Sequence, residues 1–222
     1  MTKPVKRRPY DSSARKAAAS ETRQAILAAA QRVFQIRGYA GATMTLIAEE
    51  AGIALDTVYA SVGKKPALMR LLVETAISGT DAPVPAEERD YVRAIRAAPD
   101  AAGKIDIYAA ALGSIQPRLA PLFRVLQSAA DLDPDLGALW REISKRRASN
   151  MKVFAQDLIA TGEVREDLSL TQVADIVWSM NAPEFYLLLA VQRGWTALAF
   201  QVWLADAWKR LLLEAPNRRM QS

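Results

Sequence analysis

Residues 43–68, TMTLIAEEAGIALDTVYASVGKKPAL, constrain the fold of this chain more than any other stretch. Thr43 can cap a short helix, and Gly52 is placed to end that helix in a tight turn. A second short helix follows after three residues and ends near Tyr59. Two lysines and a proline then open another helix. Two short helices joined by a tight, glycine-containing turn form a helix-turn-helix unit, whose second helix fits the major groove of DNA.

Helical periodicity extends over the rest of the chain. The pattern predicts a first helix from a Ser20 cap to a stop at Gly38, and another helix that opens near Pro66. Glycine and proline residues then predict a connection at 78–89. No strand-like alternation exceeds four residues, so the predicted fold is all-α. Further helices are expected near 88–97, 103–114, 117–130, 134–161, 169–191 and 196–214.

The composition argues against several classes of function. The chain has 222 residues, of which none is cysteine and none is histidine. Disulfides and thiolate metal sites are therefore excluded, as are histidine-based catalysis and most zinc chemistry. The adjacent carboxylates at 49–50 and 87–88 point in different directions on a helix, so they are poor candidates for acid–base catalysis. We expect no enzyme activity, no cofactor and no metal.

The location of the charged residues is also informative. Residues 1–20 hold six basic side chains and one acidic side chain, whereas the other 202 residues carry 23 of each. A basic arm of this composition is predicted to be disordered in the free protein. Either it is a solvated tail, or it attracts the phosphates of DNA. The longest uncharged run, 194–205, is too short to cross a membrane, and no signal peptide opens the chain. We therefore expect a cytoplasmic protein without a membrane partner.

Residues 22–73 resemble the N-terminal domain of the TetR family of transcriptional regulators. The matching positions lie on the predicted helices and on the turn between them, and together they are specific for the family. They are Ile26, Leu27, Ala30, Phe34, Gly38, Tyr39, Thr43, Ile47, Ala48, Ala51, Gly52, Ile53, Thr57, Val58, Tyr59, Lys65 and Leu68.

The resemblance implies contacts with double-stranded DNA. The start of the first short helix would lie over a phosphate, where exposed N–H groups favour an anion. Thr57 can donate a hydrogen bond to a base edge or a phosphate, and Tyr59 offers its ring and its hydroxyl. Lys65 matches the lysine with which the family holds the DNA backbone. The predicted DNA-binding residues are Thr43, Thr45, Leu55, Asp56, Thr57, Tyr59, Lys64 and Lys65.

Two residues of the second short helix depart from the family pattern. Ala54 stands where the family has a capping serine, a loss of about 1 kcal/mol to the helix. Asp56 replaces a small residue in the first turn. Its carboxylate could serve as a substitute cap, or it could accept a hydrogen bond from a cytosine amino group.

Residues beyond 80 carry no comparable motif. The resemblance implies a helical domain that dimerises through its last two long helices and encloses a ligand pocket. Both helices are apolar around more than one face, as expected if each also contacts a second copy. The predicted interface residues are Val173, Val177, Leu187, Leu188, Phe200, Trp203 and Trp208. The predicted pocket residues, each of which could equally be plain core, are Tyr108, Leu112, Phe123, Leu126, Trp140, Met151, Phe154 and Trp178.

These patterns predict a basic arm at 1–20, a DNA-binding domain at 21–77 and an effector-binding and dimerisation domain at 78–222. The expected function is that of a homodimeric repressor, released from a pseudo-palindromic DNA operator by a small apolar effector. DNA binding follows from the residues, whereas the repressor and effector roles follow from the resemblance. The alternative is a DNA-binding or architectural protein without an effector, which a filled domain without a cavity would favour.

Overall fold

The computed structural model describes residues 12–214 of the chain. Helices make up the fold of this described part, and a single isolated bridge between Val164 and Leu213 is its β-type pairing. The first four helices are α1 (Ser12–Gly41), α2 (Met44–Ala51), α3 (Leu55–Val62) and α4 (Lys65–Ser78). After the short turn η1 (Ala86–Glu88) come α5 (Asp90–Ala97), α6 (Ala101–Ala130), α7 (Pro134–Ile159), α8 (Leu170–Met180), α9 (Pro183–Leu187), the π-helical turn η2 (Leu188–Gln192) and α10 (Ala197–Leu212). The all-α prediction is confirmed.

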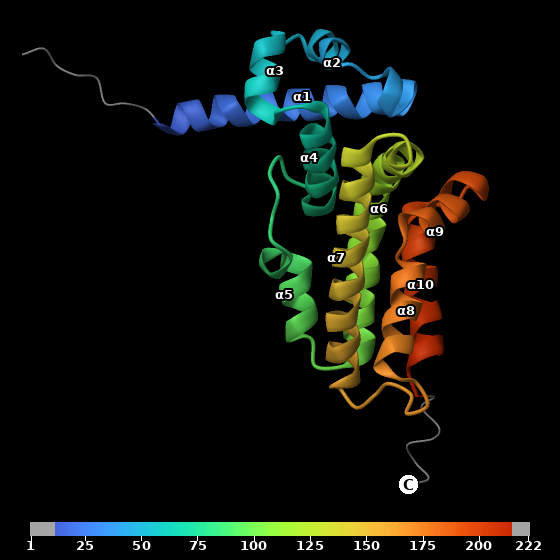
Figure 1. The fold of residues 1–222 in the computed structure, drawn as a ribbon. Helices are drawn as coiled ribbons and strands as arrows, with labels where there is room; N and C mark the ends of the chain where they lie inside the picture. The colour runs from blue at the N-terminus through green and yellow to red at the C-terminus, as the bar shows by residue number, and fades with distance from the viewer. Residues whose placement is uncertain (1–11, 215–222) are drawn as a thin grey trace, which may run out of the picture.

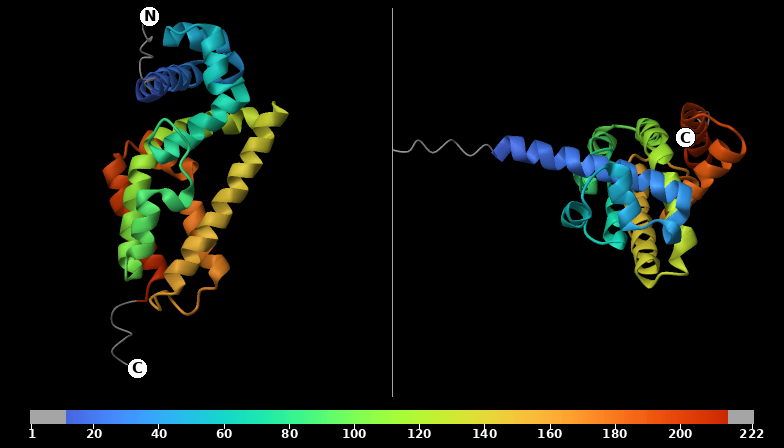
Figure 2. Two further views of the ribbon diagram at one scale, coloured as in Figure 1. Left: turned by 90° about the vertical axis from the view of Figure 1, so that its left-hand side faces the viewer. Right: turned by 90° about the horizontal axis from the view of Figure 1, so that it is seen from above.

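Helices α1 to α3 lie across one end of the molecule, and α4 leads from them into the larger domain (Figure 1). There α6 and α7 run alongside each other, with α5 on one side and α8, α9 and α10 on the other (Figures 1 and 2). The smaller domain thus meets the larger one mainly through α4 and the neighbouring part of α6, which also contacts α1.

The helix-turn-helix forms as its sequence predicts. Thr43 Oγ1 accepts a hydrogen bond from the Leu46 amide at 3.1 Å, which caps α2. Gly52 ends α2 with a φ of 66°, a left-handed conformation that glycine adopts without strain. The two helices pack through fully buried Ile47 and Val58. Ala54 makes no side-chain cap at α3, as its short side chain requires.

The first helix begins earlier than predicted. It starts at Ser12, so residues 12–20 of the predicted disordered arm are helical. Ser20 is not an N-cap; its hydroxyl instead donates to Asp81 at 2.5 Å, in the connection after α4. The alanines at 17–19 continue a helix readily, so the serine that follows them does not mark where the helix starts. Residues 1–11 of the predicted arm lie outside the described part.

Two predicted helix boundaries in the larger domain were wrong. Helix α6 runs through Pro117 and Pro121, although a break was expected at the first of them. Each proline removes one backbone hydrogen bond, but the helix is held on both sides of the prolines by buried residues such as Ile115 and Phe123. The predicted helix at 169–191 is interrupted at Asn181, because Pro183 opens the separate helix α9.

No helix in residues 12–214 is both long enough and apolar enough to span a membrane.

Candidate functional site

The outer face of the helix-turn-helix exposes most of the predicted DNA contacts. Thr43 and Thr45 are exposed at the start of α2, and Asp56, Thr57 and Tyr59 are exposed on α3. The Tyr59 side chain is 44% exposed, although it is aromatic. Of the others, Leu55 is half-buried against the domain core and Lys64 is exposed just before α4. This face carries hydroxyls, a carboxylate and a cation with no core function in the described chain.

Lys65 has a different position from the one expected. Its ammonium donates to the carbonyl oxygens of Tyr39 at 2.7 Å and Ala42 at 2.8 Å, and it lies 4.1 Å from the centre of the Tyr39 ring. Burial lowers the pKa of Lys65. Two of its three donors therefore serve to join the start of α4 to the end of α1. The contact of Lys65 with the DNA backbone stays a prediction, and the structure adds a role that the sequence did not indicate, a link between two helices.

Replacing Lys65 by methionine is expected to lower the free energy of unfolding by about 2 kcal/mol, because two charge-assisted hydrogen bonds to carbonyls are lost. The matched Lys64→Met variant removes an exposed cation and is expected to leave stability within about 0.5 kcal/mol of wild type. Urea denaturation of both variants measures the difference. Equal stabilities of the two variants would contradict the structural role of Lys65.

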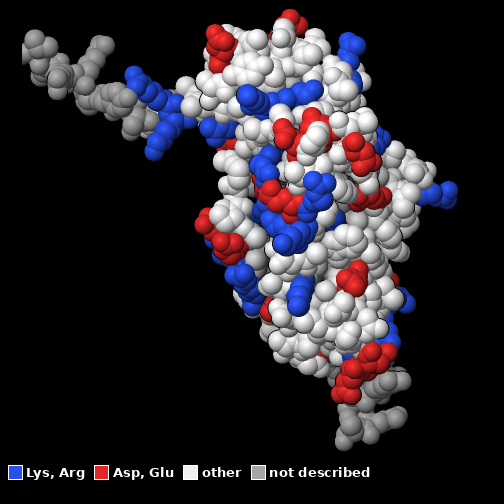
Figure 3. Space-filling model, in the orientation of Figure 1, with Lys and Arg blue, Asp and Glu red and all other residues white. Residues whose placement is uncertain are grey.

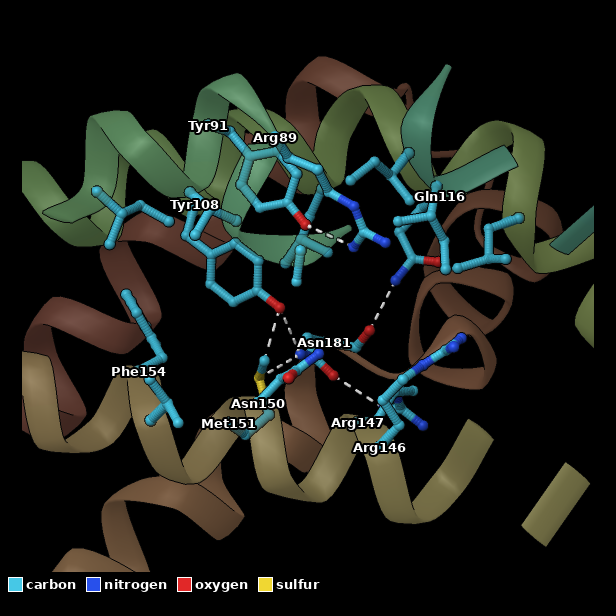
Figure 4. Close-up of a pocket in the computed structure, with 18 of the residues that line it drawn as sticks. Arg89, Tyr91, Tyr108, Gln116, Arg146, Arg147, Asn150, Met151, Phe154 and Asn181 are labelled. Carbon is cyan, nitrogen blue, oxygen red and sulfur yellow. Dashed lines mark hydrogen bonds between the residues drawn. The ribbon is translucent and has the colours of Figure 1, made fainter. Parts of the chain in front are cut away.

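A cavity of about 510 Å³ lies in the larger domain, between η1, α5, α6 and α7, and reaches Ile77 of α4 and Asn181 after α8. Its volume falls within the range of small-molecule sites. Figure 4 shows aromatic side chains, among them Tyr91, Tyr108 and Phe154, on one side and the polar groups of Gln116, Arg146 and Arg147 on the other. The cavity therefore offers apolar contact area and a small polar region.

Five of the eight predicted pocket residues line this cavity: Tyr108, Leu112, Phe123, Met151 and Phe154. The other three do not. Leu126 is fully buried in the core next to the helix-turn-helix domain, and Trp140 packs edge-on against Phe123. Trp178 lies on the surface, where the Arg147 guanidinium is 5.2 Å from its ring centre. Periodicity identifies apolar helix faces, but it does not tell which of them borders a void.

Asn181 organises the polar region of the cavity. Its side-chain amide donates to the Tyr108 hydroxyl at 2.9 Å, and its side-chain oxygen accepts from Arg147 at 2.8 Å. Its backbone carbonyl accepts from the Gln116 amide at 2.7 Å. Burial raises the pKa of Tyr108. Burial also lowers the pKa of Arg147, and the nearby Glu184 carboxylate and Tyr108 partly offset that decrease. Asn181 was missed from the sequence because it stands in an interruption of the helical pattern.

Residues 26–72 match the family model for bacterial regulatory proteins of the tetR family. The N-terminal domain is that of the TetR family. Several solved structures also share the fold over most of this chain. SmeT in its complex with triclosan superposes with a TM-score of 0.67 at 14% identity, over 88% of this chain and 93% of that one. No curated protein matches the sequence.

Two further structures show the same fold. NalD, the secondary repressor of the MexAB-OprM multidrug efflux pump in Pseudomonas aeruginosa, superposes with a TM-score of 0.67 at 16% identity, over 87% of this chain and 98% of NalD. A proposed transcriptional regulator from Saccharomonospora viridis, in complex with choline, gives 0.64 at 18% identity, over 88% of this chain and 100% of that one. At such identities the likeness establishes a TetR-type fold.

Helix α4 joins the TetR-type domain to the cavity. Arg70 forms a two-pronged ion pair with Glu142 of α7, both contacts at 2.6 Å. Arg146, which lines the cavity, donates to the largely buried carboxylate of Glu74 on α4. Figure 3 shows basic and acidic side chains close together on this face of the molecule. Two ion pairs therefore connect α7, which lines the cavity, to a helix that also belongs to the TetR-type domain.

Four of the predicted dimer contacts were assigned to the wrong helix face. Val173, Val177, Phe200 and Trp208 are fully buried within their own chain, where they face α6 and α7. Leu187 and Trp203 are half-buried, and Leu188 is 50% exposed. The outward apolar face of α10 consists instead of Leu198, Val202 and Leu211, which are 66%, 60% and 42% exposed. Both faces of α10 are apolar, so the sequence pattern did not distinguish inside from outside.

Proposed function

We propose that this chain is a homodimeric, sequence-specific transcriptional repressor that a small effector releases from a pseudo-palindromic DNA operator. The observation that carries the proposal is the exposed polar face of α3 within a TetR-type domain. On this reading α3 enters the major groove, Thr57 and Tyr59 contact bases or phosphates, and the start of α2 lies over a phosphate. Residues 21–77 would read DNA in the cytoplasm, and no step of the proposal requires catalysis.

Lys64 and Lys65 contribute to DNA binding in different ways under this proposal. Lys64 is exposed and adds an unspecific attraction to the backbone. Lys65 has one donor left after its two carbonyl contacts, and its link to α1 holds the start of α4 beside the helix-turn-helix. Asp56 is exposed in the first turn of α3, where its carboxylate would accept a hydrogen bond from the amino group of a cytosine and so favour that base.

A dimer is part of the proposal because one recognition helix reads only half of a palindrome. The exposed apolar side chains of α10, together with Leu188, form a surface that a second copy could cover. Pairing of equivalent helices about a two-fold axis would make a four-helix contact, the usual solution for such faces. Residues 78–222 would then carry both the dimer contact and the effector site.

The cavity favours an effector-responsive repressor over an architectural protein. Effector can lower the affinity for DNA only if it binds the free form more tightly than the DNA-bound form. The ion pairs from α7 to Arg70 and Glu74 supply the physical link, because α4 starts at the lysine that holds α1. Two proteins of the same fold form complexes with triclosan and choline, which supports a small ligand for this chain without indicating which one.

Selection of bound fragments from random duplex DNA tests the proposal. At fixed, near-physiological salt, the full-length protein is expected to recover a palindromic sequence and to bind it far more tightly than a scrambled duplex. Weak binding that does not depend on sequence would contradict the operator-reading function. It would shift the assignment toward an architectural protein.

Changing Leu198 and Val202 together to glutamate is expected to convert the dimer into a monomer. Four carboxylates would then face one another across an apolar contact, which costs several kcal/mol. The fold should survive because both side chains are exposed. Analytical ultracentrifugation at micromolar protein measures the mass. Leu132→Glu, at an exposed leucine in the loop between α6 and α7, is the control and should stay dimeric.

Removing residues 1–11 tests the basic arm. That segment carries Lys3, Lys6, Arg7 and Arg8 against Asp11 alone. If the arm contacts phosphates, the slope of log affinity against log salt becomes shallower by about 0.9 for each lost contact. Fluorescence anisotropy on the selected duplex at several salt concentrations gives the slope. An unchanged slope would identify the arm as a solvated tail.

A further inference from the structure

The cavity contains more positive charge than its neighbours neutralise. Arg89 donates to the Val84 carbonyl and approaches the Tyr91 hydroxyl at 3.5 Å, and it forms no ion pair within the described residues. Arg147 donates to the backbone of Trp178 and to Asn181, and no carboxylate of the described chain lies within ion-pair distance of it. A guanidinium that is partly buried without a paired anion is expensive unless a ligand supplies that anion.

The other charged groups at the cavity do not cancel this excess. Asp157 lines the wall, but Lys104 pairs with it at 3.0 Å. Arg146 is held by Glu74, and the remaining charged lining residues, Glu87 and Arg96, are exposed to solvent. The Glu184 carboxylate attracts Arg147 and partly offsets the effect of burial on its pKa, but it forms no ion pair with that guanidinium. Arg89 and Arg147, on opposite sides of the same space (Figure 4), are therefore the partly buried guanidiniums of the cavity without an ion-pair partner in the described chain.

Gln116 adds an unpaired hydrogen-bond acceptor. Its side chain is 1% exposed and lines the cavity. Its amide nitrogen donates to the Asn181 carbonyl, which fixes the orientation of the group, and its oxygen is buried without a hydrogen-bond partner in the described chain. Such an oxygen is free to accept a hydrogen bond from a molecule in the cavity. Because Gln116 and Arg147 both bind Asn181, a donor on that molecule would lie close to the anion that Arg147 would hold.

We propose that the cavity binds an amphipathic organic acid that carries a hydroxyl near its carboxylate. The carboxylate lies between Arg89 and Arg147, the hydroxyl donates to the Gln116 oxygen, and the apolar chain extends along Tyr108 and Phe154. A cationic ligand would meet two guanidiniums there, and a neutral apolar one would supply neither an anion for the guanidiniums nor a donor for the Gln116 oxygen. The inference rests on the proposed function only in treating this cavity as the effector site.

Isothermal titration calorimetry of the full-length protein, without DNA, tests the ligand class with four probes of equal chain length. Affinity is expected to decrease from β-hydroxydecanoate to decanoate to decanol, with about tenfold or more between decanoate and decanol. Decyltrimethylammonium should bind most weakly. The proposal fails if decanol or the cation binds as tightly as decanoate, if the hydroxyl brings no gain, or if no probe binds.

Two variants assign the binding to the named residues. Arg147→Gln should weaken decanoate binding about tenfold or more and leave decanol binding nearly unchanged. Arg89→Gln removes the other guanidinium, which precedes α5. It tests the same proposal if loss of the Asn181 contact unfolds the Arg147→Gln variant. Arg141→Gln, at an exposed arginine of α7 outside the cavity, is the control. Unchanged decanoate affinity in a folded Arg89→Gln or Arg147→Gln variant would overturn the assignment.

The outcomes separate this inference from the proposed function. Selection of DNA requires no ligand, and the probe ranking requires no DNA. A protein that selects a palindrome but ranks the probes in another order keeps the proposed function and loses the ligand class. A protein that ranks the probes as expected but selects no sequence loses the operator-reading function alone.

Discussion

Replacing Thr57 and Tyr59 together by alanine is expected to abolish recognition of the selected operator. Each of these α3 side chains is exposed and makes no core contact that the fold requires. A base or phosphate contact is worth about 1–3 kcal/mol, so loss of two in each half-site, four in the dimer, should weaken binding by about several hundredfold at the least. Fluorescence anisotropy with the selected duplex and a scrambled duplex gives the affinity and the specificity.

The control for this variant is a pair of exposed residues far from the helix-turn-helix. Lys152→Ala with Gln156→Ala changes two exposed side chains near the far end of α7 and should leave both affinities as in wild type. Thermal melts of both variants should match wild type within a few degrees. Operator binding that survives the Thr57/Tyr59 change would remove α3 as the reading helix, whatever the fold resemblance implies.

Changing Trp208 to alanine is expected to lower the free energy of unfolding by about 3–5 kcal/mol, the largest stability effect of any substitution considered. Trp208 is fully buried and stacks on Tyr108, with ring centres 5.6 Å apart. Its loss would open a cavity next to the proposed ligand site, at the contact between α10 and α6. Chemical denaturation followed by circular dichroism measures the change.

Trp208→Phe separates ring packing from hydrogen bonding. The indole nitrogen has no hydrogen-bond partner in the described chain, so its removal should cost little, and the phenyl ring keeps most of the packing. A core role predicts that the loss on Trp208→Ala is the same at every protein concentration. If the loss of stability disappears at high protein concentration, Trp208 instead contributes to a subunit interface.

Local signals in the sequence were sufficient for the helix-turn-helix. The Thr43 cap and the Gly52 turn act within a few residues, so they form wherever the helices pack. Pro117 did not end α6, because packing against α4, α7 and α10 outweighs one missing hydrogen bond. Ser20 did not start α1, because a capping side chain acts only at the end of a helix, and α1 already begins at Ser12.

The candidate ligand site was only partly predictable, for a related reason. Apolar periodicity located Tyr108, Met151 and Phe154, which face inward from long helices. It could not place Arg147, which on α7 looks like an ordinary surface residue until Asn181, 34 positions away, supplies its partner. Contacts between distant segments decide which polar side chains are turned inward, and one sequence contains no direct record of them.

Helix α4 has a consequence for the construction of hybrid regulators. Its first residue, Lys65, holds the end of α1, and Arg70 and Glu74 reach α7 in the other domain. Under the proposed function, the junction between the DNA-reading and ligand-sensing parts therefore runs along α4, and not through the connection that follows it. A chimera joined after residue 78 would bring a foreign α7 against Arg70 and Glu74 and leave their charges without partners. A functional exchange must transfer α4 together with its acceptor residues on α7.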